Sequence, residues 1–302
     1  METVHSRVGG RRRSFALRLP ATASSQVPLV LVLHGNRSSV FGPIQRLADS
    51  RAQRVYGFGA CADRHGIAVA YPNARGGAWA DGRGVTRSDT QGVDDVAFLR
   101  AVAEWCADRY GAGHAGVMVA GISNGAFMAH RMALEASDLV AAIGAIAGGL
   151  PAAIADSRPT HAVSALLING TADRIVPIEG GHSRRRAPDG RPRGRTLSLA
   201  ETARRWSEFD RCTTAETIEE QPSGPGPDDL AVTRRITTGG VGRTRVEAWT
   251  IHGMGHTWPG APVPAALERA LGKSPSNVDA AEALCRFAIP LLEPAEHRRI
   301  PD

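Results

Sequence analysis

Residues 117–136 read VMVAGISNGAFMAHRMALEA. A short apolar run at 117–120 leads into a Gly-x-Ser-x-Gly turn at 121–125, and a helical run at 126–136 follows. Strand, tight turn and helix form the setting of a nucleophile elbow, which projects its serine above a sheet. A Cβ atom two residues on either side of that serine would collide with backbone, so glycine is needed there. The stretch therefore predicts Ser123 as a nucleophile.

Strand and helix patterns alternate along the rest of the chain. Continuous apolar runs fit strands that are buried on both faces of a parallel sheet. The expected strands are 12–19 at a sheet edge, Val27–Leu33, 67–71, 117–120, 165–168 and Val246–Ile251. The expected helices are 93–110, capped by Asp94 or Asp95, then 126–136, 197–209 and 277–292. This alternation predicts an α/β fold with a mainly parallel central sheet flanked by helices, in a single domain over 1–302 with its core at about 11–292.

The composition is that of an ordinary globular protein. Of 302 residues, 42% are hydrophobic and 22% charged, which excludes collagen, a coiled coil and wholesale disorder. No apolar run approaches the roughly 18 residues that a membrane span needs, so no membrane partner is expected. The four cysteines form no Cys-x-x-Cys motif or Cys/His cluster, so a structural zinc site is not expected either. Arg18 interrupts the apolar residues near the N-terminus, which favours a cytoplasmic protein over a secreted one.

Positive charge is concentrated at 182–195, which reads HSRRRAPDGRPRGR. This segment holds six arginines and one aspartate, a net charge of +5 against +6 for the whole chain. It could bind anions or nucleic acid, but it lacks interleaved aromatic residues for base stacking. Two prolines and two glycines deny it regular structure. We therefore expect a solvated loop and no nucleic-acid partner.

A serine nucleophile needs a base, and the base needs an acid to orient it. With this type of elbow, the acid and then the base follow the serine along the chain, each on a loop after a strand. Asp173 follows the strand at 165–168, and His256 follows Val246–Ile251 in a glycine-rich loop. An aspartate in a turn is more often a cap or turn former, and a lone histidine is usually a core or surface residue. His252 competes with His256, but it lies at the strand's edge, where the sheet would fix its side chain.

An oxyanion hole needs two backbone N–H groups. One is expected from Asn124, directly after the nucleophile. The other is expected from Asn36, in the loop after Val27–Leu33, where Gly35 permits a close approach. His34 is expected to brace this loop through hydrogen bonds. The chemistry needs no metal and no organic cofactor.

Five stretches occur in a fixed order, and they read LVLHGN, DRHGIAVAYPN, VAGISNGAFMAHRMA, LLINGTADRIVPIEGG and IHGMGHTWPG. With them, the chain resembles the polyhydroxybutyrate depolymerase and feruloyl esterase branch of the α/β-hydrolases over about 11–287. The resemblance implies the α/β-hydrolase fold and a triad of Ser123, Asp173 and His256. It also implies that Trp258 lines an acyl or aryl pocket; a tryptophan packed in the core is the alternative.

The chain departs from this resemblance in two ways. Family members are commonly secreted and often carry a cysteine pair after the position of Gly181, whereas Cys212 has no partner near 237–240. The lack of this expected disulfide and the lack of an expected signal peptide both favour a reducing compartment. The arginine-rich segment at 182–195 is also unusual, and it could cover the active-site mouth because it follows the loop that bears Asp173.

These observations predict a serine carboxylic-ester hydrolase that acts through an acyl-enzyme. The expected substrates are hydroxyalkanoate oligomers or small esters, because the chain has no room for a separate polymer-binding domain. A feruloyl or acetyl-xylan esterase is the alternative. A peptidase, and an anion-binding protein with a vestigial triad, are weaker alternatives. Nothing in the sequence predicts an oligomeric state.

Overall fold

A computed structural model describes residues 2–21, 27–36, 55–186, 190–221, 226, 228–292 and 294–301. The strands in these ranges are β1 Glu2–Val8, β2 Arg11–Arg18, β3 Val27–Leu33, β4 Ala68–Pro72, β5 Ala112–Ile122, β6 Val140–Ile146, β7 Ser164–Gly170, β8 Gly181–Arg186, β9 Pro192–Thr196, β10 Thr214–Glu220, β11 Val232–Thr238 and β12 Val246–Ile251. The α-helices are α3 Phe58–His65, α4 Arg87–Thr90, α5 Asp95–Tyr110, α6 Asn124–Glu135, α7 Leu199–Phe209, α8 Ala265–Leu271, α9 Ala280–Ala288 and α10 Ala295–Arg298. Four short 3₁₀ turns complete the described elements: η1 Arg75–Gly77, η2 Ala152–Ile154, η3 Val241–Arg243 and η4 Ile289–Leu291.

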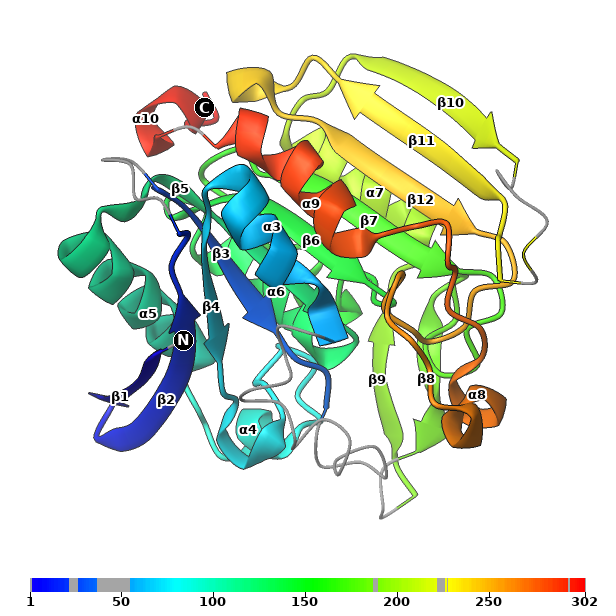
Figure 1. Cartoon of the computed structure of the whole chain (residues 1–302), viewed down its shortest axis with the longest axis horizontal. Helices are drawn as coiled ribbons and strands as arrows, with labels where there is room; N and C mark the ends of the chain where they lie inside the picture. The colour runs from blue at the N-terminus through cyan, green and yellow to red at the C-terminus, as the bar shows by residue number, and fades with distance from the viewer. Residues whose placement is uncertain are drawn as a thin grey trace.

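The described strands form one large sheet and one separate hairpin (Figure 1). The large sheet has the order β1-β2-β4-β3-β5-β6-β7-β12-β11-β10, and the hairpin pairs β8 with β9. Its six central strands, from β4 to β12, run parallel, whereas β1, β2, β11 and β10 pair antiparallel at the two sides. The predicted α/β fold with a mainly parallel sheet is confirmed.

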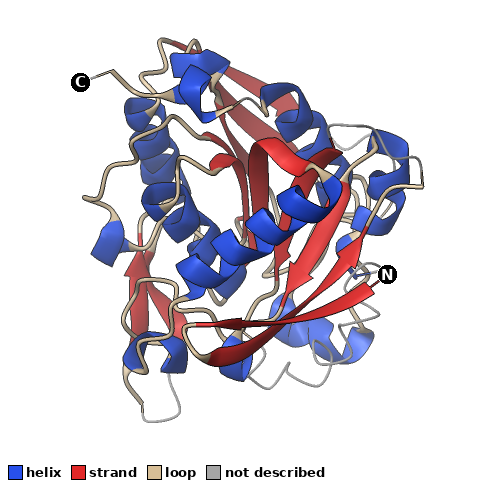
Figure 2. Ribbon diagram, turned by 90° about the vertical axis from the view of Figure 1, so that its left-hand side faces the viewer, coloured by secondary structure: helices blue, strands red, loops and turns tan. Residues whose placement is uncertain are grey.

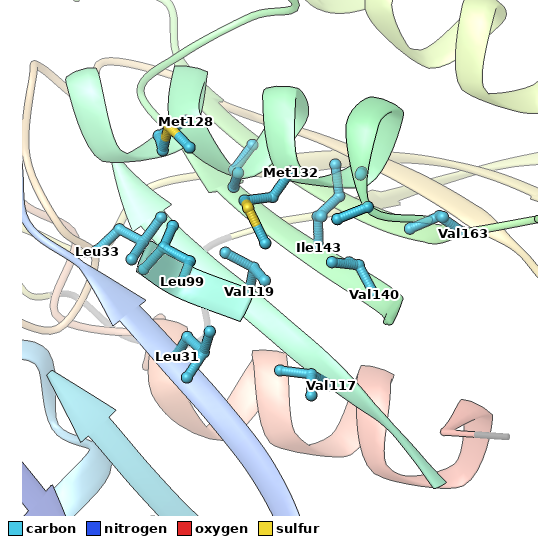
Figure 3. Packing of buried hydrophobic residues seen from close by; sticks show 14 of the residues in the cluster. Leu31, Leu33, Leu99, Val117, Val119, Met128, Met132, Val140, Ile143 and Val163 are labelled. Atoms are coloured by element: carbon cyan, nitrogen blue, oxygen red, sulfur yellow. The ribbon is translucent and has the colours of Figure 1, made fainter. Parts of the chain in front are cut away.

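Two hydrophobic clusters cover the two faces of the sheet, because side chains alternate along each strand. In β3, Leu31 and Leu33 belong to one cluster, and Val30 and Val32 belong to the other. The first cluster includes buried side chains of α5, α6 and α7, and the second includes those of α3 and α9. Figure 3 shows Leu99 of α5 and Met128 and Met132 of α6 close to strand residues of the first cluster. Figure 2 shows helices on both sides of the strands.

The register of the sheet brings four chemically interesting loops to one edge. Leu33 at the end of β3 lies beside Gly121 of β5, and Gly170 at the end of β7 lies beside Ile251 of β12. Ligand sites of open α/β sheets lie at this carboxyl edge of the strands. The elbow, the loop of Asn36 and the loops after β7 and β12 therefore meet at the place where a site is expected.

Several sequence predictions are confirmed and some are wrong. Val27–Leu33 and Val246–Ile251 are strands with the predicted bounds, and Asp94 rather than Asp95 caps α5 by accepting from the Ala97 N–H at 2.8 Å. The strand predicted at a sheet edge is β2, but β1 pairs with its outer side, so it is not an edge strand.

The largest correction concerns the arginine-rich segment. The prediction of an irregular loop at 182–195 is wrong, since β8 and β9 form an antiparallel hairpin there. Pro192 is the first residue of β9, a position where a strand tolerates a missing N–H. Residues 187–189 lie outside the described ranges.

Other properties of the described chain bear on partners and redox state. Each of the four cysteines is a free thiol. No helix within the described ranges has the length and apolar character to cross a membrane. No group of three or more His, Cys, Asp or Glu side chains in those ranges is placed to hold a metal ion.

Candidate active site

Ser123 sits in a strained turn between β5 and α6. Its backbone has φ 56° and ψ −119°, a region that side-chain-bearing residues rarely adopt. The strain is held by hydrogen bonds on both sides, from the Ser123 N–H to the Ile146 carbonyl at 2.9 Å and from the Phe127 N–H to the Ser123 carbonyl at 3.0 Å. Such strain is typical of functional turns in which the surrounding structure fixes the conformation.

The two glycines of the pentapeptide make this turn possible. A Cβ atom on Gly121 would lie 2.4 Å from the backbone carbon of Gly125. A Cβ atom on Gly125 would lie 2.2 Å from the carbonyl oxygen of Leu33, at the end of β3. Both contacts involve backbone, which cannot move aside as a flexible side chain could. The structure thus confirms that a side chain at either glycine position would collide with backbone, as inferred from the sequence.

Asp173 and His256 form a buried hydrogen-bonded pair. The His256 Nδ1–H donates to Asp173 Oδ2 at 2.7 Å, and the two residues are 9% and 3% exposed. The other carboxylate oxygen, Oδ1, accepts from the backbone N–H groups of Ile175 at 2.7 Å and Val176 at 2.9 Å. Because Nδ1–H is donated to Asp173, the other ring nitrogen, Nε2, carries a lone pair that can accept a hydrogen bond from a hydroxyl group.

The loop after β12 separates the two candidate histidines. His252 is exposed, and its Nε2 contacts the Thr233 hydroxyl at 2.9 Å. The His256 backbone N–H donates to the Leu271 carbonyl at 2.6 Å, which fixes the loop against α8. The structure therefore places His256, and not His252, beside Asp173.

Ser123 and His256 line the same pocket, of about 170 Å³. Gly35 and Asn36 line this pocket. Asn124 is not part of the lining, but it directly follows Ser123, which is. Asn124 is the first residue of α6, where a backbone N–H has no acceptor within the helix. The apolar part of the lining is Val55, Tyr56, Ile122, Ile175, Trp258, Ala261, Pro262, Val263, Pro264, Leu267 and Leu271.

The side chain of Asn124 anchors the elbow to a neighbouring loop. Its Oδ1 accepts from the Trp79 N–H at 2.7 Å, and its Nδ2 donates to Asp81 Oδ2 at 2.6 Å. Asp81 is fully buried, and it also binds the guanidinium of Arg83, with Nη2 to Oδ2 at 2.8 Å. Sequence reasoning missed Asp81, because its glycine-rich surroundings carry no periodic pattern or spacing that points to the elbow.

His34 braces the loop that carries Asn36. Its Nε2 accepts from the Ala74 N–H at 3.1 Å, so its Nδ1 carries the proton and donates to the Gly35 carbonyl at 2.6 Å. The His34 carbonyl accepts from the indole N–H of Trp79 at 2.9 Å. These contacts agree with the structural role expected for His34.

Trp258 is both packed in the core and part of the lining of this pocket. It is 5% exposed and packs edge-on against Tyr56, with ring centroids 4.9 Å apart, as a core tryptophan would. It also contributes to the pocket that Ser123 and His256 line. A rigid aromatic wall of this kind holds an apolar group without losing side-chain entropy.

The fold and the arrangement of strands, elbow and loops define an α/β-hydrolase. No family model matches the chain. Over 287 residues the chain is 31% identical to the protein named "Putative esterase NocK" of Nocardia uniformis subsp. tsuyamanensis, covering 90% of this chain and 80% of that protein. The chain therefore belongs to the same esterase family.

The chain is also similar to solved structures. The native structure of the protein pOPH has a TM-score of 0.51 at 15% identity, and the match covers 99% of this chain and 90% of that chain. At this identity the likeness shows the fold alone. An acetyl xylan esterase from Aspergillus awamori has a TM-score of 0.49 at 17% identity, over 81% of this chain and 89% of that chain.

Proposed function

We propose that this protein is a serine carboxylic-ester hydrolase that acts through an acyl-enzyme. Ser123 is the nucleophile, His256 the general base, and Asp173 the acid that orients the base. The backbone N–H groups of Asn36 and Asn124 hold the oxyanion. The observation that carries the proposal is the 2.7 Å bond from His256 to Asp173 in a pocket that the strained Ser123 also lines.

The proton path follows from the hydrogen bonds of the imidazole. With Nδ1–H donated to Asp173, the neutral ring presents Nε2 as an acceptor for the Ser123 hydroxyl proton. The serine oxygen then attacks the ester carbonyl, and the imidazolium returns its proton to the leaving alcohol. A water molecule deacylates the enzyme by the same route, with His256 as base again. Asp173 stabilises the imidazolium in both steps.

The size and lining of the pocket support a small ester or the end of an oligomer. About 170 Å³ beside Trp258 suits a short acyl or aryl group. Hydroxyalkanoate oligomers or small esters are therefore the proposed substrates, in line with the resemblance to polyhydroxybutyrate depolymerases. Feruloyl esters, which would stack an aromatic acid on Trp258, are the second candidate.

A panel of esters tests the proposal and ranks the substrates. Purified protein is assayed on p-nitrophenyl esters of increasing acyl length, on hydroxybutyrate oligomers and on methyl ferulate. We expect short acyl chains to be preferred, and we expect Ser123→Ala to lower kcat by several orders of magnitude. Equal turnover by the wild type and Ser123→Ala would contradict the role of Ser123, and hydrolysis of aminoacyl anilides alone would indicate a peptidase.

A further inference from the structure

The β8–β9 hairpin presents two of its arginines to the pocket of Ser123 and His256. Along the hairpin, Arg185 and Arg193 are half-buried, whereas Arg184, Arg186 and Arg195 are exposed. Arg185 and Arg193 line the pocket. In β8, alternation sets the half-buried Arg185 apart from Arg184 and Arg186. In β9, Arg193 and Arg195 are two residues apart, and the register shift of the hairpin between them separates the half-buried Arg193 from the exposed Arg195.

Hydrogen bonds tie this hairpin to the loop of the proposed catalytic acid. The Ile175 N–H donates to Asp173 Oδ1 at 2.7 Å. The Ile175 carbonyl accepts from the Arg184 N–H at 3.0 Å and from the Ser183 hydroxyl at 3.0 Å. One residue therefore joins the carboxylate that orients His256 to the strand that carries Arg185. The hairpin is a fixed wall of the site.

A second contact joins the hairpin to the elbow. A Cβ atom on Gly194 would lie 2.8 Å from the Cβ of Arg83, so β9 packs closely on that side chain. Arg83 is held by the buried carboxylate of Asp81 and lies over the Phe127 ring at 4.0 Å. Asp81 also accepts from Asn124, next to the nucleophile. The position of Arg193 is thus coupled to the elbow through three side chains.

The pocket lining carries two positive charges, those of Arg185 and Arg193. The described residues that line the pocket include no aspartate or glutamate. Burial lowers the pKa of Arg193, and the neighbouring positive charges of Arg83 and Arg185 lower it further. The charges of Arg185 and Arg193 would both attract an anionic group that enters the pocket.

We propose that Arg185 and Arg193 bind a carboxylate of the substrate, so that the preferred esters are anionic. This inference rests on the proposed esterase function and names its substrate class. Guanidinium groups recognise carboxylates through paired, charge-assisted hydrogen bonds. The apolar wall around Trp258 and Leu267 takes the hydrocarbon part of the same molecule.

Matched pairs of esters test the proposal. Mono-4-nitrophenyl glutarate is compared with 4-nitrophenyl pentanoate, which replaces the terminal carboxylate of the acyl part by a methyl group. On the alcohol side, 3-carboxyphenyl acetate is compared with 3-carbamoylphenyl acetate. The wild type should favour the anion in at least one pair by about tenfold or more in kcat/KM, the size expected for hydrogen bonds to a charged group. This preference should weaken as salt is added.

Variants separate the pair from the general charge of the hairpin. Arg185→Gln, Arg193→Gln and the double variant should bring the ratio of kcat/KM for the anionic ester to kcat/KM for its neutral partner close to one, whatever the change in the absolute rates. Arg184→Gln removes an exposed arginine from the adjacent position of β8 and should keep the preference. A wild type that shows no anion preference in either pair, or a preference that survives in the double variant, overturns the proposal.

A binding measurement distinguishes this failure from failure of the esterase function. Glutarate is titrated into Ser123→Ala protein and followed by NMR, with the same titration after Arg185→Gln and Arg193→Gln. Saturable binding that the arginine substitutions abolish supports the carboxylate site even if no ester is hydrolysed. Ester hydrolysis without anion preference, together with no glutarate binding, overturns the carboxylate site and leaves the esterase function standing.

Discussion

Asp173 divides its two carboxylate oxygens between two tasks. Oδ1 closes the turn by accepting from the Ile175 and Val176 N–H groups, and Oδ2 accepts from His256. An aspartate that forms a turn and an aspartate that orients a base are competing interpretations of the sequence. In the structure one side chain closes the turn with Oδ1 and binds His256 with Oδ2, so the proposed role in orienting the base is compatible with a role in the turn.

Replacing Asp173 by asparagine tests this division. The amide oxygen would keep the two backbone N–H donors, so the amide NH₂ would face His256 and favour the tautomer protonated at Nε2. That tautomer cannot take the serine proton, so kcat should fall by about 10⁴-fold while the fold survives. Steady-state kinetics and circular dichroism measure the two effects. Asp228→Asn, at an exposed carboxylate, is the control, and an active Asp173→Asn enzyme would refute the role of Asp173.

The local sequence was enough to predict the three residues of the proposed triad. Each of the three residues follows a recognisable apolar strand. The turn-forming residues around it, and the order of nucleophile, acid and base along the chain, limit the candidates for each role. The sequence also indicated that the segment 182–195 could lie at the mouth of the site, because it follows the loop of Asp173. It could not show that Arg185 and Arg193 line the pocket or that Asp81 holds the elbow, since these contacts depend on tertiary packing.

The elements differ in how strongly their own residues specify them. An apolar run identifies β3, and a mainly apolar run that contains Glu247 and Thr250 identifies β12, because nearly all residues of both strands are buried. The strand β6 reads VAAIGAI, and its alanines and glycine carry little strand propensity. The polar strand β10 is exposed along six of its seven residues, so it has no buried pattern to detect.

The elbow is an element whose geometry two glycines determine. Gly125→Ala would force a methyl group against the Leu33 carbonyl, 2.2 Å away, so we expect a loss of about 1–3 kcal/mol of unfolding free energy and a lower kcat. Chemical denaturation and ester kinetics would measure both. Gly84→Ala is the control: Gly84 has φ +71° in open space, and its substitution should cost about 1 kcal/mol with activity retained. The interpretation fails if Gly125→Ala matches the wild type in both assays.

At the scale of the whole molecule, buried ionisable groups link stability to pH. His130 of α6 is fully buried, and its Nδ1 accepts from the indole N–H of Trp206 at 3.1 Å. Burial lowers the pKa of His130 to about 3. Burial also raises the pKa of Asp210, whose Oδ1 accepts from the Val163 N–H at 2.9 Å. The two groups affect stability in opposite directions.

Proton linkage gives the direction in which His130 changes the unfolding free energy as the pH falls. Between pH 6.5 and about 3 the unfolded histidine is protonated and the folded one is not, so His130 lowers the unfolding free energy as the pH falls, by up to about 1.4 kcal/mol per pH unit. Asp210 acts oppositely: it lowers the unfolding free energy as the pH rises above the ordinary range of an aspartate. The two slopes partly cancel in the wild type.

Difference curves against single variants separate these contributions. The stability advantage of the wild type over His130→Gln should shrink as the pH falls from 6.5 toward 4. The advantage over Asp210→Asn should instead shrink as the pH rises from 4 toward 6.5. Urea denaturation at several pH values measures both. If both differences in unfolding free energy stay constant with pH, burial does not shift the pKa values of His130 and Asp210.

The proposed convergence of Ser123, Asp173 and His256 is tested most directly by covalent labelling with a fluorophosphonate, followed by intact-mass and peptide mass spectrometry. We expect a single adduct per chain, located on Ser123, absent in Ser123→Ala, and formed orders of magnitude more slowly in His256→Ala. An adduct on a different side chain, or labelling of Ser123 at an unchanged rate without His256, would contradict the account.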